Sequence, residues 1–542
     1  MKKLIISVIS IMMAQGMSAQ DFKVVVNTDK EPMQTGKFKP TLKGLSGYQC
    51  PQWFEDAKFG IWAHWGVQCA AEYGDWYARK MYEQGHRYYR YQIAMMGHPS
   101  EKGFKDWIPR WKAEHWNADS LVAFYKECGA RYFMAMANHH DNFDNYDSKY
   151  QPWNSVNMGP HKDIIGGWAA AAKKYGLPFG VSLHLAHAWC WYETSRGSDS
   201  KGPLKGVRYD GWLTKADGKG TWWEGYDVQD LYEQRHPLSK NSRKWDWQIG
   251  EVTTPDQAYC DRVYNRSVDL INKYDPQIVY YDDTYVPLWP VSDCGLKITA
   301  HLYNKSMAEH GGKNMAVATG KILTPEMKQT IVWDVERGVP DSIQPLHWQT
   351  CTCIGSWHYD KFRYYDDTYK TPQQVITMLI DIVSKNGNLL LNVPVRSDGT
   401  IDPTEHRIVK EIGRWMRING EAIYGTRPWV TFGEGPASEK RNGIKEQGFN
   451  EKNIKLTARD IRFTKKGNNL YVFTLGRPDT DIVVKSLASG GKLKGKIKKV
   501  EMLGSTENVK WKQDKGGLHI VSPVSVPCDE AVAFRVTTNK RL

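Results

Sequence analysis

The chain has 542 residues, too many for one ordinary domain and enough for a large catalytic domain with a smaller second one. Its 41% hydrophobic and 25% charged residues are typical of a globular protein and exclude an intrinsically disordered one. The net charge of +13 either reflects a merely basic surface or favours anionic partners such as sulfated or uronic polysaccharides. Nucleic acid is not expected as a partner, because the sequence carries no basic helical stripe and no nucleic-acid-binding motif.

The first residues predict export from the cell. Lys2 and Lys3 precede an apolar run over residues 4–13, and small residues at 17–19 precede Gln20. This is the pattern of a secretory signal peptide over residues 1–19, in a style that predicts a bacterial periplasmic or secreted protein. No later stretch approaches about 18 consecutive apolar residues, so we expect no membrane span.

The nine cysteines are odd in number and scattered, which argues against a disulfide framework. Cys351 and Cys353 form a C-x-C pair without a second ligand pair, and such a pair is a weak metal signal. We therefore expect neither a structural metal nor a cofactor.

Residues 20–432 alternate short apolar runs with amphipathic helical patterns. Strands are predicted at 60–64, 132–137, 179–183, 278–281, 315–318, 330–333 and 389–393, and helices at 118–128, 168–175, 257–274 and 372–384. Buried strands that alternate with helices indicate a parallel sheet and the α/β class. Over this length the leading architecture is a (β/α)₈-type barrel that forms the catalytic domain.

The pattern changes after residue 433. Short alternating runs at 469–473, 482–485, 518–521 and 531–534 predict an antiparallel β-sandwich over 433–542. Lysines crowd residues 492–499, and we interpret them as protection of a sheet edge rather than as a binding stripe. Within the barrel, residues 195–246 lack periodicity and predict a long loop, a common location for substrate specificity.

Carboxylates follow the strand at 278–281. In a barrel of this type, catalytic side chains lie at the carboxyl ends of the strands. Asp282 and Asp283 come directly after two tyrosines. A strand-end carboxylate beside aromatic rings suits a glycosidase nucleophile, which attacks the anomeric carbon of a sugar. The alternative is a helix cap or a solvated loop.

Other strand ends carry imidazoles and further carboxylates. His139 and His140 follow the strand at 132–137, where they would hold sugar hydroxyls or bind a metal with a distant carboxylate. His64 ends the first strand, and its alternative role is that of a core histidine. Asp334 and Glu336 share one face by strand alternation, so either one could supply a second carboxylate.

Several longer motifs then occur in one order. They are WFEDAKFGIWAHWG at 53–66, DWY at 75–77, NHHDNF at 138–143, DIVSKNGNLLLNV at 381–393 and NGEAIY at 419–424. Together they resemble the motifs of glycoside hydrolase family 29, the α-L-fucosidases, and the resemblance covers about residues 50–535. It implies a barrel with a C-terminal β-sandwich, a retaining mechanism, and a fucosylated oligosaccharide or polysaccharide as the substrate.

The resemblance also implies roles for individual residues. The nucleophile follows a motif usually written WFD, which here reads Tyr280-Tyr281-Asp282, so Asp282 is the expected nucleophile. The substrate-binding residues that we expect from the same strand ends and motifs are His64, Trp65, Trp76, His139, His140, His184, Trp333 and Trp357.

The general acid/base is where the sequence departs from the family. Many members carry Glu in a WE motif, whereas this chain has Gln349 at the matching place, and a neutral amide cannot protonate a leaving group. We expect Glu336 to replace it, with Arg337 or a neighbouring group tuning its pKa. Glu251 and Glu326 are weaker candidates. A retaining pair predicts carboxyl oxygens about 5–5.5 Å apart.

Two further departures concern the sugar pocket. The strand at 179–183 lacks the Tyr common in the family and leads into His184, His187 and Trp189, and Lys321 lies where many members have Arg. These changes keep open a related sugar, L-galactose, which differs from L-fucose by one hydroxyl. The alternatives to an enzyme of this type are a sugar-binding protein that has lost catalysis and a metal-dependent hydrolase that uses His139 and His140.

Overall fold

The computed structural model describes residues 21–241, 244, 247, 251–439, 448–453 and 455–542. The expected signal peptide lies outside the described residues. None of the helices in the described residues combines the length and the apolar character that crossing a membrane requires.

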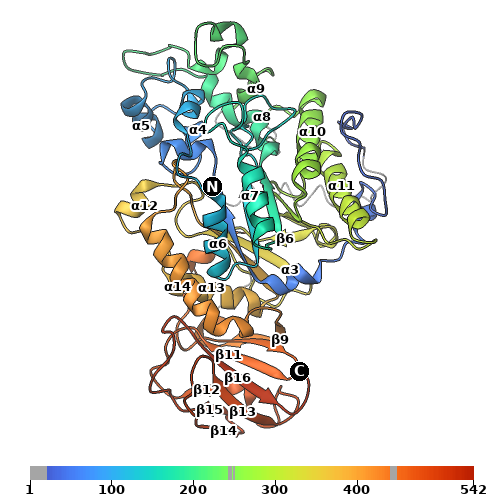
Figure 1. Cartoon of the computed structure of the whole chain (residues 1–542), viewed down its shortest axis with the longest axis vertical. Coiled ribbons are helices and arrows are strands. Elements are labelled where there is room, and N and C mark those ends of the chain that lie inside the picture. The colour runs from blue at the N-terminus through green and yellow to red at the C-terminus, as the bar shows by residue number, and fades with distance from the viewer. Residues whose placement is uncertain (1–20, 242–243, 245–246, 248–250, 440–447, 454) are drawn as a thin grey trace.

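A closed parallel barrel forms the larger part of the molecule (Figure 1). Each strand pairs with the next along the chain, and β1 pairs with β8 to close the ring. This confirms the predicted barrel. Its strands are β1 (Phe59–Ala63), β2 (Tyr132–Met136), β3 (Phe179–Leu183), β4 (Ile278–Tyr281), β5 (Val317–Gly320), β6 (Val332–Asp334), β7 (Trp348–Cys353) and β8 (Gly387–Asn392).

Helices surround the barrel, and shorter helices lie in the segments above it (Figure 1). The longer ones cover the strands: α6 (Ala118–Glu127), α7 (Ile164–Lys174), α10 (Gln257–Tyr274), α11 (Cys294–Glu309), α13 (Pro372–Ser384) and α14 (Pro403–Asn419). The shorter ones are α2 (Leu42–Leu45), α3 (Gln52–Ala57), α4 (Tyr77–Lys80), α5 (Arg87–Met95), α8 (Ala188–Trp191), α9 (Val228–Tyr232), α12 (Lys361–Tyr365) and α15 (Pro436–Glu439).

The sequence specifies where α13 and α14 begin. Thr371 caps α13 and Asp402 caps α14, each in a capping box with the residue three positions on, and Pro372 and Pro403 follow at the first helical position. These caps satisfy backbone N–H groups that have no partner inside the helix.

The barrel interior is a packed core rather than a channel. Alternate strand residues point inward and form one apolar cluster that includes Trp62, Met134, Tyr280 and Leu390. The residues between them point outward against the helices. This core closes the barrel from below, so polar groups at the carboxyl ends of the strands face the mouth.

The C-terminal residues form two antiparallel sheets, which confirms the predicted sandwich. The five-stranded sheet has the order β13-β16-β11-β10-β9 and the three-stranded sheet the order β12-β15-β14. Their strands are β9 (Arg427–Glu434), β10 (Ile461–Lys466), β11 (Asn469–Thr474), β12 (Ile482–Val484), β13 (Ile497–Met502), β14 (Trp511–Asp514), β15 (Gly517–Ile520) and β16 (Val532–Thr538). β9 already belongs to this unit, so the sheet begins a few residues before the expected boundary at 432/433.

A buried ionic contact joins the sandwich to the barrel. Asp381 on α13 accepts hydrogen bonds from Arg462 Nε of β10 at 2.6 Å and from Lys385 Nζ at 2.9 Å. The three side chains are at most 1% exposed. Nearby, Trp415 Nε1 of α14 donates to the backbone oxygen of Ala531 at 2.9 Å. The two parts therefore share a polar interface that water does not reach.

Removing the shared carboxylate tests this interface. Asp381→Ala leaves two buried cations without their common anion, so we expect a loss of about 3–5 kcal/mol in the free energy of unfolding. Equilibrium urea unfolding measures it. Glu411→Ala breaks an exposed pair with Arg407 and should change stability little. Equal stability of the two variants would contradict a structural role for the buried contact.

Candidate active site

Six polar side chains meet where the strands end at the barrel mouth. His64 follows β1, His140 follows β2, His184 follows β3, Asp282 follows β4, Lys321 follows β5 and Glu336 follows β6. Carboxyl ends of parallel barrel strands lie at one rim, so residues far apart in the sequence come together there.

Asp282 is the most heavily contacted of these groups. It forms an ion pair with Lys321. Its Oδ2 lies 3.2 Å from His140 Nε2 and 3.7 Å from His184 Nε2. The ring of His140 is oriented by its Nδ1, which lies 2.8 Å from the backbone oxygen of His184. The carboxylate is thus held in one orientation from two sides.

Lys321 links Asp282 to a second carboxylate. Its Nζ also donates to Glu336 Oε2 at 2.6 Å. Because both carboxylates contact one ammonium nitrogen, their facing oxygens lie no more than about 5 Å apart, close to the separation of a retaining pair. The side chains of Asp282 and Glu336 are only 18% and 16% exposed, so the pair lies in an enclosed mouth.

Electrostatics keep Asp282 ionised. Burial alone would raise the pKa of its carboxyl, but the ammonium of Lys321, assisted by His184 and by the hydrogen bond from His140, holds that pKa well below its usual value. Burial likewise opposes the charge of Lys321, and Asp282 and Glu336 raise the pKa of Lys321 well above the ordinary range.

Asp283, the neighbouring carboxylate, has a different environment. Its oxygens accept hydrogen bonds from the backbone N–H groups of Thr284 at 2.7 Å and Leu288 at 3.2 Å. His187 Nε2 lies 3.7 Å from its Oδ1. Asp283 therefore holds the loop after β4 in place, and Asp282 is the one that contacts Lys321.

A cluster of imidazoles lines the rest of the mouth. The ring of His64 lies 5.2 Å from that of His139 and 4.7 Å from that of His358. Both ring nitrogens of His64 and of His358 are buried and have no hydrogen-bond partner among the described residues, although Asp75 Oδ1 lies 3.6 Å from His358 Nδ1. Buried polar groups of this kind call for a bound partner, and sugar hydroxyls can both donate to and accept from a neutral imidazole.

Burial keeps four of the histidines near the mouth, His64, His139, His184 and His187, uncharged near neutral pH. Burial lowers the pKa of His64 and of His139 well below the usual value, with further lowering by neighbouring histidines. Burial also lowers the pKa of His184 and of His187 to about 3. Neutral rings also suit metal ions, and His64, His139 and His358 each offer one nitrogen within 4.8 Å of the others.

Aromatic rings form the walls beside the imidazoles. Trp357 lies 5.4 Å from Trp62 and 5.6 Å from His64, and Trp191 of α8 lies 4.6 Å from His140. Trp76 packs edge-on against Trp191 at 4.9 Å. Such rings provide apolar surfaces for the carbon face of a sugar, while the imidazoles reach its hydroxyls.

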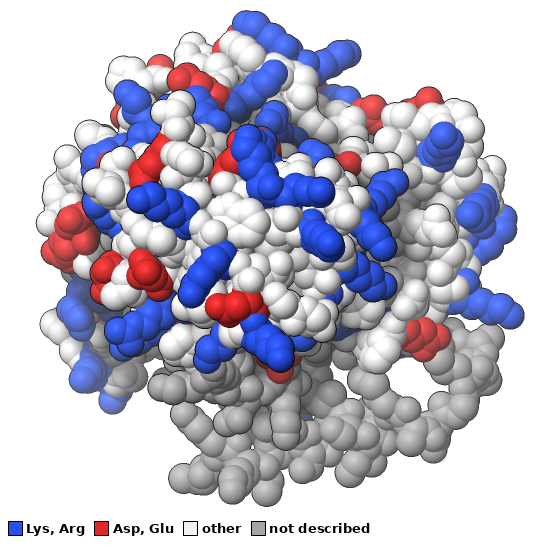
Figure 2. Space-filling model, turned by 90° about the horizontal axis from the view of Figure 1, so that it is seen from below, with Lys and Arg blue, Asp and Glu red and all other residues white. Residues whose placement is uncertain are grey.

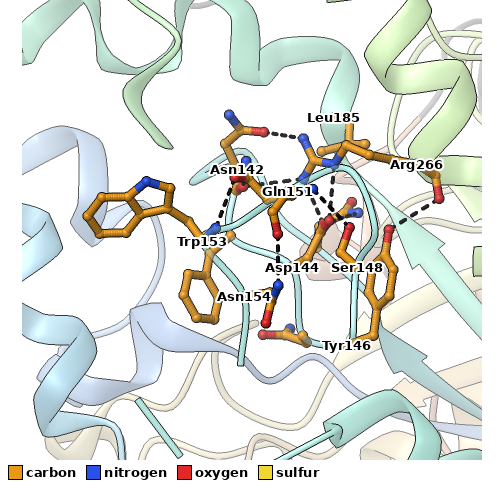
Figure 3. Close-up of polar contacts among 12 residues, drawn as sticks. Asn142, Asp144, Tyr146, Ser148, Gln151, Trp153, Asn154, Leu185 and Arg266 are labelled. Carbon is orange, nitrogen blue, oxygen red and sulfur yellow. Dashed lines mark hydrogen bonds and ion pairs between the residues drawn. The ribbon is translucent and has the colours of Figure 1, made fainter. Parts of the chain in front are cut away.

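The loop after His139 and His140 is fixed by a buried charge pair (Figure 3). Arg266 of α10 donates to Asp144 through Nη2 at 2.6 Å and Nε at 3.1 Å, and to Asn142 Oδ1 at 2.5 Å. Gln151 adds a bond to the backbone oxygen of Asn142 at 3.0 Å. Since the loop is tied to a barrel helix, the two histidines have little freedom to turn away from Asp282.

Most of the expected substrate-binding residues reach this mouth, but two do not. Trp65 lies outside the barrel, where its ring packs against Trp111 and Trp168 between the strands and the helices. Trp333 also points outward on β6, and Lys328 Nζ lies 3.3 Å from its ring centre. Both corrections have one cause: a residue next to an inward-facing one on a strand faces the helices.

The side chains of two residues that the sequence connects with the acid/base, Gln349 and Arg337, lie away from Glu336. Gln349 lies inside the barrel core, where Tyr132 donates to its Oε1 at 2.9 Å and its Nε2 donates to Asp334 at 2.8 Å. It is therefore not a substitute for a catalytic acid. Asp334 lies beside Gln349 in the barrel core, and burial raises the pKa of Asp334 to about 7. Arg337 turns away to Glu451 at 2.9 Å, so the cation beside Glu336 is Lys321.

The sequence alone did not identify His358 as a pocket residue. It follows β7 in the segment Ser356-Trp357-His358-Tyr359, which resembles a family motif of the form SWGY that has Gly at this position. Asp75 orients this segment by accepting from the backbone N–H of His358 at 2.7 Å. In the sequence, the replacement of the motif's Gly by His358 was the only indication of a special role. The contact of His358 with His64 is evident only from the fold.

Two carboxylates in an enclosed barrel mouth, surrounded by aromatic rings and neutral imidazoles, are the arrangement of a glycoside hydrolase. Comparison with known proteins narrows this class. The family model described as alpha-L-fucosidase matches residues 25–421, and the model of the alpha-L-fucosidase C-terminal domain matches residues 454–537. The chain belongs to the α-L-fucosidase family and is a glycoside hydrolase.

Individual relatives agree with this assignment. Tissue alpha-L-fucosidase of Bos taurus is 26% identical over 92% of this chain and 91% of its own length. The structure of Thermotoga maritima alpha-fucosidase covers 92% of this chain and all of its own, with a TM-score of 0.66 and 23% identity. A trapped covalent intermediate of a Bacteroides thetaiotaomicron GH29 alpha-L-fucosidase has a TM-score of 0.58 and 17% identity, covering 90% of this chain and 95% of its own.

The contact between Lys321 and Asp282 predicts a pH effect. Lys321→Met removes the main cation that lowers the Asp282 pKa, so that pKa should rise and the acidic limb of kcat/KM should move to higher pH by at least about one unit. A pH profile on an aryl α-L-fucoside measures the shift. Lys328→Met makes the same change outside the barrel and should leave the limb in place. An unmoved limb in Lys321→Met would contradict the proposed coupling.

Proposed function

We propose that the chain is an exported, retaining exo-α-L-fucosidase in which Asp282 is the nucleophile and Glu336 is the general acid/base. The observation that carries the proposal is the contact of both carboxylates with Lys321. Their small exposure supports action on a terminal sugar, because an enclosed mouth admits the end of a glycan more readily than its middle. Export is supported by the signal-peptide pattern of residues 1–19.

The reaction has two displacements. In the first, an oxygen of Asp282 attacks C1 of the α-L-fucosyl unit, the bond from C1 to the leaving oxygen breaks, and Glu336 gives that oxygen its proton. In the second, Glu336 takes a proton from water, the hydroxide oxygen bonds to C1, and the ester to Asp282 breaks. The sugar leaves with its original anomeric configuration.

Lys321 suits both steps because it contacts both carboxylates. In the first step Asp282 loses its negative charge as it forms the glycosyl ester, and Glu336 gains one as it gives its proton to the leaving oxygen. The ammonium lies within reach of either location. The charge thus moves from one carboxylate to the other without leaving its counterion, which lowers the cost of redistributing charge in an enclosed site.

The buried histidines and the aromatic walls support recognition of a terminal sugar. His64 and His358 offer ring nitrogens to hydroxyls, and Trp357 offers an apolar face. Because the pocket contains several polar side chains, α-L-galactosides remain alternative substrates. Parallel assays on aryl α-L-fucoside and aryl α-L-galactoside distinguish the two sugars. The position of Gln349 in the core gives no support to a protein that has lost its acid.

The nucleophile is tested by substitution. Asp282→Asn should lower kcat on an aryl α-L-fucoside by at least about 10³-fold, because a neutral amide cannot form the glycosyl ester. Asp283→Asn is the matched control: it makes the same change one residue away, and its single amide oxygen keeps one of the two loop hydrogen bonds, so far more turnover should remain. A 2-fluoro-fucosyl fluoride that labels a peptide without Asp282 would overturn the assignment.

The acid/base is tested by its dependence on the leaving group. Glu336→Ala should lower turnover of fucosides with poorly acidic alcohol leaving groups by about 10²–10⁴-fold, since these need a proton. With fucosides of acidic phenols, the rate of the first step should fall much less. Added azide should restore the rate of the second step, with fucosyl azide as the product. Glu326→Ala, at an exposed position, is the control. Equal losses on both classes of substrate would remove Glu336 from this role.

A further inference from the structure

The positive charge of the chain is concentrated in its C-terminal residues. Residues 458–542 contain 17 Lys and Arg against eight Asp and Glu, which gives +9 of the total net charge of +13. Residues 21–457 contain 54 Lys and Arg against 52 Asp and Glu. The basic character therefore belongs to the sandwich, and the barrel that carries the candidate active site is close to neutral.

Three separate segments bring six exposed cations together on the sandwich. Backbone bonds join these segments: Leu542 N–H donates to Gly467 at 3.0 Å and Asn539 N–H donates to Lys496 at 3.1 Å. We call the group the C-terminal cationic cluster, and its members are Lys466, Lys494, Lys496, Lys498, Lys540 and Arg541.

Among the residues that the structure describes, no salt bridge pairs any of these six cations with an acidic side chain. Within the described residues, the salt bridges of the sandwich involve other side chains, such as Lys499 with Glu501 at 2.7 Å and Arg535 with Glu501 at 3.1 Å. The end of the molecule that carries the sandwich shows many Lys and Arg side chains and fewer acidic ones (Figure 2). Unpaired like charges repel one another, so their concentration on one domain is a cost that an anionic partner would offset.

Protection of a sheet edge accounts for only part of the cluster. β13 is an edge strand of the five-stranded sheet, and lysines on and just before it, such as Lys496 and Lys498, would discourage pairing with another chain. Lys466 lies at the turn between β10 and β11, and Lys540 and Arg541 lie beyond the end of β16. These three do not border the free edge, so a second role is needed for them.

We propose that the C-terminal cationic cluster binds the sulfate or carboxylate groups of an acidic polysaccharide. The six cations lie on three neighbouring segments of the sandwich, so they present several positive charges together to a linear polyanion. Lysine ammonium groups on flexible stems suit anions whose exact positions vary along a polymer.

The position of the cluster indicates a tethering role, which rests on the proposed fucosidase function. The sandwich lies at the opposite end of the molecule from α8 and α9, which belong to the loops after β3 (Figure 1). A monosaccharide or short glycan would not reach both places, whereas a long polymer would. Binding at the sandwich then raises the local concentration of terminal sugars at the barrel mouth without touching the chemistry.

The test uses two variants of the full chain with equal loss of charge. One carries Lys494→Gln, Lys496→Gln and Lys498→Gln, and the control carries Lys510→Gln, Lys512→Gln and Lys515→Gln around β14 on the other sheet. Titration calorimetry with dextran sulfate, and with uncharged dextran of equal length, measures binding. We expect the first variant to bind dextran sulfate at least tenfold more weakly and the control less than twofold more weakly, with no binding of dextran.

Several results would overturn the proposal. Equal weakening of binding in the two variants would indicate an effect of net charge alone. Absence of dextran sulfate binding by the unchanged chain would also contradict the proposal. Binding confined to phosphatidylglycerol vesicles would indicate a membrane surface as the partner. Turnover of an aryl α-L-fucoside should be the same in all three proteins. If that turnover is absent while dextran sulfate binding persists, the proposed enzyme function fails and the polyanion site stands.

Discussion

The candidate active site depends on one ammonium group that two carboxylates share. Without Lys321, two enclosed carboxyl groups would lie a few ångströms apart with no cation between them. Burial by itself raises the Asp282 pKa, so the cation has to overcome a penalty before that carboxyl ionises. In the proposed mechanism the same ammonium also stays beside the negative charge when it moves from one carboxylate to the other.

The fold supplies this contact from three different strand ends. Asp282, Lys321 and Glu336 follow β4, β5 and β6, so the neighbour relations of the sheet place them side by side. The histidines come from β1, β2 and β3 on the adjoining part of the rim, and the Arg266–Asp144 pair fixes the loop that carries two of them. Rigid strands below and a braced loop above give the preorganisation that the enclosed chemistry requires.

Much of this could be predicted from the sequence, and the failures have physical reasons. α10 and α13 begin and end where their periodicity and caps predict. β7 was missed, because its inward residues Gln349 and Cys351 pair with polar partners in the core and do not form an apolar run. Gln349 also lies on this strand, and a motif match cannot distinguish a core residue such as this one from a residue at the rim. Lys321 and His358 were visible only as departures from the family, because their roles arise from contacts across the barrel.

The buried contact of Asp381 with Arg462 and Lys385 has a consequence for protein engineering. A domain that only a flexible linker joins to its neighbour can be removed without exposing a buried charge. Here the sandwich contributes a guanidinium to a buried contact on α13, so excision would leave the Asp381 carboxylate without the Arg462 cation on newly exposed helix. A shortened or chimeric version of this enzyme needs compensating substitutions on that helix before it can fold alone.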